Sequence, residues 1–287
     1  MKKIIVILAV LVAAFSLSAA VFAQRTVVDV KGSDTMVMLT QALAEAYQKA
    51  NANNFVTVSG GGSGVGIAAL LNKSIDIATS SRPMTAAELE TAKKNGVAAK
   101  EVKVALDGVC IIIHKSNGVK NLTTQQLADI YTGKITNWKQ VGGKDLKIVA
   151  LSRDKSSGTY AFMLEHILRG GNSKGTEEYA KSVLMLASSN AIATEVAKNK
   201  AAIGYVGLGY ADLKKHNEIA IAAKGSTKYI LPSAKTILDN SYPISRPLFF
   251  YLKENNNAAA NKFVDYVLSA AGQKIVEAQE FVPINKK

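Results

Sequence analysis

Residues 148–160 read IVALSRDKSSGTY, an apolar run followed by a short polar stretch. Apolar side chains then recur at helical spacing as far as residue 168. This stretch predicts a strand, a polar turn and the start of a helix. The turn offers an arginine, three hydroxyls and a glycine beside helix N–H groups that lack intrahelical partners, so an anion would fit there. An ordinary helix cap is the alternative interpretation, because Ser and Thr are preferred at that position.

The same pattern occurs three times in the N-terminal part of the chain. The predicted strands are residues 26–30, 55–58 and 75–78. Polar turns follow them with the sequences GSDTM (32–36), SGGGSGVG (59–66) and TSSRP (79–83), and a helical pattern follows each turn. Three such units predict an α/β sheet with parallel strands, which binds ligands at the carboxyl ends of its strands. The glycine-rich turn fits no dinucleotide, P-loop or nucleophile-elbow motif.

Two long extended segments, residues 103–114 and 242–252, are predicted to cross between two lobes. The first crossing is expected at Asp107 and Gly108. Lobe I would then comprise residues 24–106 with 243–287, and lobe II residues 107–242. Two lobes joined by two strands form a hinge around a ligand cleft. The predicted fold class is α/β, with two lobes and two crossover strands.

The N-terminus predicts export. Residues 1–23 combine a basic start, a short apolar run and a small-residue end, which is typical of a cleavable signal peptide, so we expect a periplasmic product. The precursor has a net charge of +13, and removal of Lys2 and Lys3 would leave +11. Because the lysines are scattered and the protein is exported, no nucleic-acid partner is expected. The single cysteine, Cys110, lies in an apolar run and is expected to be buried.

The sequence does not favour enzyme chemistry. His114, His166 and His216 lie on a predicted strand, helix and loop, away from the four turns, whereas a nucleophilic serine needs a base within reach. The spacings typical of zinc ligands are absent from the sequence. We therefore expect no catalytic residue, metal or cofactor, and keep a phosphatase as the less favoured alternative.

The four turns occur in an order that resembles a known family. Together with DGV (107–109), YTGKITNW (131–138) and IGYV (203–206), they resemble the phosphate-binding component of the bacterial phosphate ABC transporter, over essentially the whole mature chain. The resemblance implies a periplasmic binding protein fold of type II and inorganic phosphate as the ligand. It also implies a membrane permease as the partner. We expect a monomer, because a hinge and a permease-facing rim leave little surface for a dimer.

The resemblance also implies the site residues. The phosphate-binding groups from the first lobe would be Ser33, Thr35, Ser63, Ser81 and Arg82. The second lobe would contribute Arg153, Ser157, Gly158 and Thr159. Asp34, Asp154 and Ser156 would support them, with Asp154 holding the Arg153 guanidinium.

One position departs from the family pattern. In the best-known branch, an aspartate on the third turn accepts the proton of hydrogen phosphate, and Ser81 stands there in this chain. Asp107 is our candidate replacement and Asp34 the second, although Asp107 could instead cap the hinge. A binding protein of the same fold for another tetraoxo anion, namely sulfate, molybdate or tungstate, is the alternative. Arg153→Ala is expected to abolish tight phosphate binding.

Overall fold

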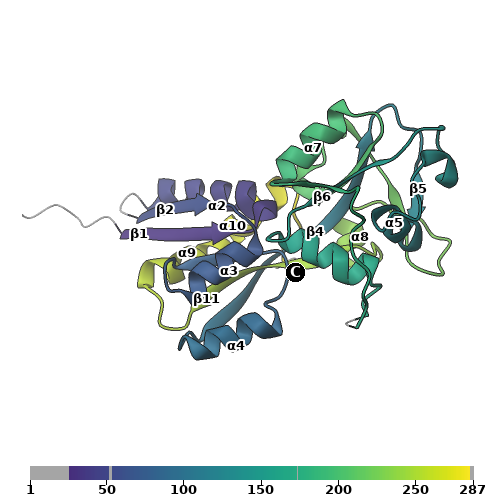
Figure 1. The fold of residues 1–287 in the computed structure, drawn as a ribbon. Coiled ribbons are helices and arrows are strands. Elements are labelled where there is room, and N and C mark those ends of the chain that lie inside the picture. Colours follow the sequence, from purple (N-terminus) through teal and green to yellow (C-terminus); the bar gives the residue numbers. More distant parts are fainter. Residues whose placement is uncertain (1–25, 52–53, 173, 285–287) are drawn as a thin grey trace, which may run out of the picture.

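The computed structural model describes residues 26–51, 54–172 and 174–284. The predicted signal peptide therefore lies outside the described residues. Two α/β bodies lie side by side and are joined at a narrow waist (Figure 1). We call the body with β1–β3 and α9 lobe I, and the body with β6 and α7 lobe II. The predicted α/β class and two-lobed organisation are confirmed.

Lobe I alternates strands and helices in its first part. Its elements are β1 (Thr26–Gly32), η1 (Asp34–Met36), α2 (Val37–Ala50), β2 (Asn54–Ser59), α3 (Ser63–Leu71), β3 (Ile77–Ser80), α4 (Ala86–Lys94), β11 (Ser245–Lys253), α9 (Ala258–Leu268) and α10 (Ala270–Ala278). As predicted, β1 is parallel to β2 and to β3, whereas β11 joins β3 in the antiparallel direction. The carboxyl ends of β1, β2 and β3 therefore meet at one edge of the sheet.

Helices cover both faces of the lobe I sheet (Figure 1). Side chains of β11 alternate between the two faces, as strand geometry requires. Phe250 packs with residues of α2, α9 and α10, and Phe249 and Tyr251 pack with residues of α3 and α4. The helix α4 starts with a capping box, in which the Thr85 hydroxyl accepts from the Glu88 amide and the Glu88 carboxylate accepts from the Thr85 amide.

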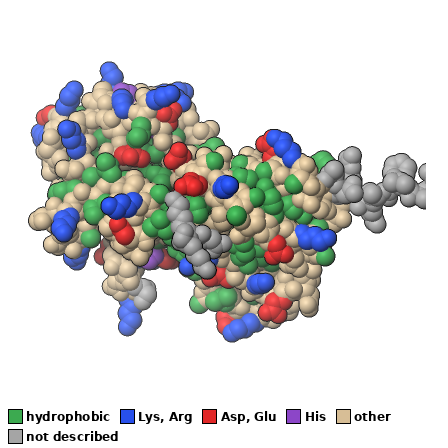
Figure 2. Space-filling model, turned by 180° about the vertical axis from the view of Figure 1, so that it is seen from behind, with side chains coloured by type: hydrophobic (Ala, Val, Ile, Leu, Met, Phe, Trp, Pro, Cys, Tyr) green, Lys and Arg blue, Asp and Glu red, His purple; other side chains and the backbone are tan. Residues whose placement is uncertain are grey.

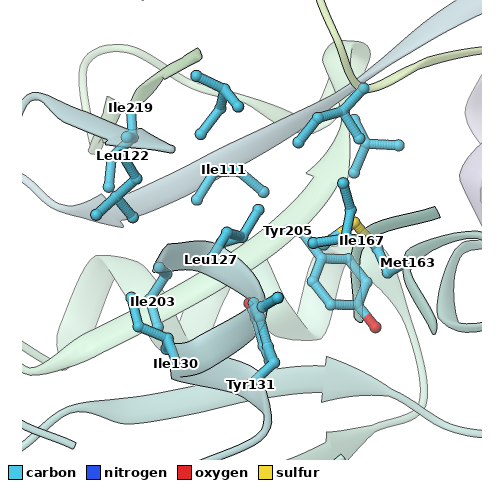
Figure 3. Packing of buried hydrophobic residues seen from close by; sticks show 14 of the residues in the cluster. Ile111, Leu122, Leu127, Ile130, Tyr131, Met163, Ile167, Ile203, Tyr205 and Ile219 are labelled. Carbon is cyan, nitrogen blue, oxygen red and sulfur yellow. The ribbon is translucent and has the colours of Figure 1, made fainter. Parts of the chain in front are cut away.

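Lobe II is built from shorter elements. They are β5 (Asn121–Thr123), α5 (Thr124–Tyr131), η2 (Trp138–Val141), β6 (Val149–Arg153), α6 (Gly158–Met163), the π-helix η3 (Leu164–Leu168), β7 (Leu184–Leu186), α7 (Ser189–Lys198), β8 (Ala202–Gly207), η4 (Leu208–Tyr210), β9 (His216–Glu218), β10 (Ala220–Ala222) and α8 (Ala234–Leu238). Its main core joins α5, α6 and the β-strands around Ile111, Leu127 and Tyr205 (Figure 3). The predicted strand–turn–helix of residues 148–168 is present as β6, a turn, α6 and η3.

The strand β4 (Ala99–His114) carries the chain from one lobe to the other. It pairs with β11 as far as Gly108 and with β8 from Val109 onward, so one nine-stranded sheet runs through both lobes. The predicted return segment, residues 242–252, also passes from one lobe to the other. Tyr242 belongs to the core of lobe II, and Phe250 belongs to that of lobe I.

Predictions about the surface and the interior can be compared with the structure. Figure 2 shows Lys and Arg side chains scattered over this face of both lobes, with acidic side chains among them. Cys110 is buried, as predicted. Within the described ranges, no helix combines the length and apolar character that a membrane span requires.

Candidate anion-binding site

The four predicted turns meet between the lobes. The turns carry hydroxyl and charged side chains that are at most 3% exposed: Ser33, Thr35, Ser63, Ser81, Arg153, Ser157 and Thr159. Two equally buried charged residues, Asp107 and Arg246, belong to the crossing strands β4 and β11. We call these nine residues the cleft cluster. Polar groups are costly to bury unless they have partners, so such a concentration marks a site.

Hydroxyl groups of the two lobes face one another within the cluster. Thr35 Oγ1 lies 2.9 Å from Thr159 Oγ1 across the cleft. In lobe I, the Ser81 amide donates to Ser63 Oγ at 3.1 Å. A β-carbon at Gly158 would lie 2.6 Å from Ser81 Oγ and closer still to Ser63 Oγ. Glycine is therefore required at residue 158 for the lobes to approach this closely.

Two helices, one from each lobe, begin at the same place. Ser157 caps α6, and its hydroxyl accepts from the amides of Thr159 and Tyr160. The helix α3 begins at Ser63 after Gly62, whose φ of +97° suits glycine. The helix dipole favours an anion at such positions, and the Ser157 hydroxyl already accepts from the Thr159 and Tyr160 amides.

Ser156 connects the lobes beside the cluster. Its carbonyl accepts from the Gly64 amide at 3.0 Å, and its hydroxyl donates to the Gly61 carbonyl at 2.9 Å. Both partners belong to the glycine-rich turn of lobe I. The Tyr210 hydroxyl makes a further link, donating to the Asp34 carbonyl at 2.7 Å. Sequence reasoning did not identify Tyr210, which lies in the segment after β8.

The predicted pairing of Asp154 with Arg153 is wrong. Arg153 Nη2 lies 2.6 Å from Asp34 Oδ2 in the opposite lobe, and its other donors reach Leu186, Ala187 and Ser189. Asp154 instead accepts from the amide and hydroxyl of Ser156. Successive side chains at a strand end point in opposite directions, so neighbours in sequence are not partners here.

Arg82 is paired within its own lobe. Its two terminal nitrogens donate to the two carboxylate oxygens of Glu88 at 2.7 and 2.8 Å. This bidentate pair is only partly buried and lies at the start of α4. Arg82 is therefore held by the capping residue of its own lobe, outside the cleft cluster.

A second guanidinium, which the prediction of site residues omitted, lies on the cluster. Arg246 of β11 is the register partner of Asp107 in β4, and its Nε and Nη2 donate to Asp107 Oδ2 at 3.1 and 2.9 Å. Arg246 Nη2 also donates to Thr159 Oγ1 at 3.0 Å. Its position in the sequence could have indicated this role, because Arg246 is a charged residue on the predicted return crossing, residues 242–252.

Burial governs the ionisation of this pair. It raises the pKa of Asp107, although the adjacent Arg246 guanidinium and the Leu208 amide oppose the shift. Burial also lowers the pKa of Arg246 from its ordinary value. Asp107 Oδ1 accepts from the Leu208 amide at 3.1 Å. The carboxylate is thus fixed in place by two crossing strands and the residue after β8.

Comparisons with known proteins agree with this architecture. A model of the PBP superfamily domain matches residues 19–271. The phosphate-binding protein PstS of Borreliella burgdorferi is 33% identical over 287 residues, covering 99% of both chains. This chain belongs to that family of phosphate-binding proteins, within the PBP superfamily. The resemblance inferred from the four turns is confirmed.

Two further members of the superfamily extend the comparison. Protein SphX of Synechococcus elongatus is 35% identical over 92% of this chain and 80% of its own length. A crystal structure from Clostridium perfringens, described as a putative phosphate ABC transporter substrate-binding protein with bound phosphate, has a TM-score of 0.81 and 32% identity. It covers 91% of this chain and 100% of that one.

The arrangement of acidic and histidine side chains was compared with that of metal ligands in the described part of the chain. Among residues 26–51, 54–172 and 174–284, no group of three His, Cys, Asp or Glu side chains could hold a metal ion. His216 Nε2 contacts the Ala193 carbonyl, and His114 contacts Ser116.

Proposed function

We propose that this chain captures inorganic phosphate between its two lobes and delivers it to the permease of an ABC transporter. Its family membership and the bound phosphate in the Clostridium perfringens structure support this function. The observation that carries it is the contact of Thr35 with Thr159, two buried hydroxyls contributed by opposite lobes. A tetraoxo anion that lay against both hydroxyls would accept hydrogen bonds from both lobes. The family consists of binding proteins, so the chain is not an enzyme.

The proposed ligand groups are those that converge in the cleft cluster. They are Ser33, Thr35, Ser63, Ser81, Ser157, Gly158 and Thr159, with Arg153 and Asp107 beside them. Micromolar binding requires about 8 kcal/mol. Hydrogen bonds to a charged group contribute about 1.5–3 kcal/mol each, so six to ten of them suffice after desolvation.

Asp107 is the proposed acceptor of the phosphate proton. Its Oδ2 receives both bonds from Arg246, whereas its Oδ1 receives that of the Leu208 amide and retains a lone pair. Asp34 is less suited, because its side chain is 14% exposed, whereas that of Asp107 is fully buried. A buried acceptor favours hydrogen phosphate over sulfate, which carries no proton at neutral pH. Molybdate and tungstate would be excluded by the same acceptor.

The lobes are proposed to close on the ligand by bending at the crossings. The moving bodies are residues 24–106 with 243–287, and residues 107–242. We propose export through cleavage of residues 1–23, function in the periplasm as a monomer, and contact of the closed rim with the permease. Light scattering of the purified mature chain tests the monomer, and N-terminal sequencing of the exported protein tests the cleavage.

Calorimetric titration of the mature chain tests the ligand. We expect micromolar or tighter binding of phosphate at pH 7, and at least about a hundredfold weaker binding of sulfate, molybdate and tungstate. Arg153→Ala should lower the phosphate affinity by more than about tenfold, roughly 1.4 kcal/mol. Equal affinity for sulfate and phosphate would contradict the proposed role of Asp107. No measurable phosphate binding would contradict the function itself.

A further inference from the structure

Arg246 lies where the chain returns from lobe II to lobe I. It is 3% exposed, and its partner Asp107 is fully buried. The aromatic ring of Phe162 in lobe II lies below its guanidinium, with the ring centroid 5.2 Å from Cζ. Arg246 therefore contacts the first crossing strand through Asp107 and lobe II through Phe162. Such a charge is retained in an interior only where it is well paired or has a further partner.

One donor of this guanidinium has no partner. Arg246 Nη1 is buried and makes no hydrogen bond to any residue in the described part of the chain. Nε and Nη2 share one edge of the planar group, and that edge faces Asp107. The second proton of Nη2 points to Thr159 Oγ1 at 3.0 Å and lies near Thr35 Oγ1 at 3.5 Å. Nη1 and Nη2 share the second edge of the planar guanidinium, so one Nη1 proton points to the same side as the Nη2 proton that faces Thr159.

An unpaired buried donor on a charged group is costly, and such groups in native proteins require an explanation. Arg153 offers a contrast within the same cluster. Its Nε, Nη1 and Nη2 each have partners, including Asp34 of the opposite lobe and Ser189 of its own lobe. Of the two guanidiniums, Arg246 thus has the terminal nitrogen that is free for a ligand, beside the two hydroxyls that meet across the cleft.

We propose that Arg246 is a phosphate-binding residue whose Nη1 donates to a phosphate oxygen held between Thr35 and Thr159. Asp107 is its positioning residue, because it fixes the other edge of the guanidinium. This inference rests on the proposed function and adds a ligand group from the hinge to those from the four turns. A group at the pivot moves little when the lobes close, so Arg246 is in place before Thr35 and Thr159 reach the anion.

The formal charges at the cluster balance one another. Arg153 and Arg246 bring two positive charges, and Asp34 and Asp107 bring two negative ones. Each arginine is matched by a carboxylate, and of the two it is Arg246 whose Nη1 is left without a partner beside Thr159. Nη1 suits a tetraoxo anion because a guanidinium stays charged at neutral pH, so its bond to an anionic oxygen is charge-assisted.

Calorimetry of single variants tests the role of Arg246. Arg246→Gln should weaken phosphate binding at least about tenfold, since a charge-assisted bond is lost. Arg246→Lys should weaken it by a smaller factor, because the charge remains and the second donor does not. Arg169→Gln is the matched control: Arg169 pairs with Glu178 on the outside of lobe II, and the affinity should stay within about twofold of wild type.

The outcomes separate this inference from the function on which it rests. Absence of phosphate binding by the wild-type chain would reject the proposed function. Wild-type binding together with an unchanged affinity of Arg246→Gln would reject the role of Arg246 alone. Because that variant leaves Asp107 buried without its partner, Asp107→Asn/Arg246→Gln, which removes both charges, is measured beside it. Circular dichroism confirms that each variant is folded.

A crystal structure of the wild-type chain with phosphate provides a test that needs no variant to fold. We expect Arg246 Nη1 at about 2.7–2.9 Å from a phosphate oxygen. A complex in which every phosphate oxygen lies beyond about 3.5 Å from Nη1 would overturn the assignment.

Discussion

Arg153 of lobe II and Asp34 of lobe I form an ion pair across the cleft, with Nη2 2.6 Å from Oδ2. Arg153 is 1% exposed, so this pair is largely removed from solvent. A buried pair stabilises a state only when its geometry is good and its remaining groups are bonded. The remaining donors of Arg153 reach the carbonyls of Leu186 and Ala187 and the hydroxyl of Ser189, so the pair favours the closed arrangement of the lobes.

Asp34→Asn should weaken phosphate binding by about 10- to 100-fold, because about 1.5–3 kcal/mol of closed-state stabilisation is lost. Calorimetry measures the affinity, and small-angle scattering of the ligand-free variant should show a larger radius of gyration. Asp145→Asn is the control, since Asp145 pairs with Lys139 on the exposed surface. An affinity within twofold of wild type would show that the pair does not contribute to closure.

Gly158→Ala should reduce phosphate affinity by more than about tenfold with little change in the stability of the fold. The added methyl group would collide with the hydroxyls of Ser63 and Ser81 and keep the lobes apart. Gly118→Ala serves as the comparison, because a β-carbon there meets no atom within 4 Å. Calorimetry and thermal unfolding together separate the effect on closure from an effect on folding. Wild-type affinity in the Gly158 variant would contradict this close approach.

The raised pKa of Asp107 predicts a pH dependence of stability. Burial disfavours the ionised carboxylate in the folded state, so its contribution is most favourable below about pH 3.9, the ordinary value for aspartate. The contribution decreases as the pH rises through the folded-state pKa. The free energy of unfolding of wild type minus that of Asp107→Asn should therefore fall between about pH 3 and pH 7. Urea titrations at several pH values measure it, and a difference that rises with pH would refute the assignment.

Tyr205→Phe should lower the free energy of unfolding by about 1–3 kcal/mol, because buried partners are left without a bond. The Tyr205 hydroxyl contacts Ser152 Oγ at 2.5 Å and Tyr179 at 3.0 Å, and it accepts from the Arg153 amide at 3.3 Å. Urea unfolding provides the measurement. Tyr229→Phe, at an exposed site, should change stability by less than about 0.5 kcal/mol. Equal stability of the Tyr205 variant and wild type would argue against this network.

Local signals were sufficient wherever a few neighbouring residues decide the conformation. The first strand was predicted at residues 26–30 and is observed at Thr26–Gly32, because its apolar side chains lie within one short segment. The third strand was placed at residues 75–78 and is observed at 77–80, two residues later. A short apolar run predicts that a strand is present more accurately than it predicts the first and last residues of that strand. The ends depend on where hydrogen bonding to the neighbouring strand stops.

The sequence by itself determined the alternating strands and helices, the four polar turns at strand ends and the two crossings, because each depends on side chains close together along the chain. The tertiary structure decided which charges meet. Asp34 and Arg153 are 119 residues apart, and Asp107 and Arg246 are 139 apart. Their pairing depends on sheet register and on the approach of two lobes, and a shift of one residue would turn Arg246 to the other face of the sheet.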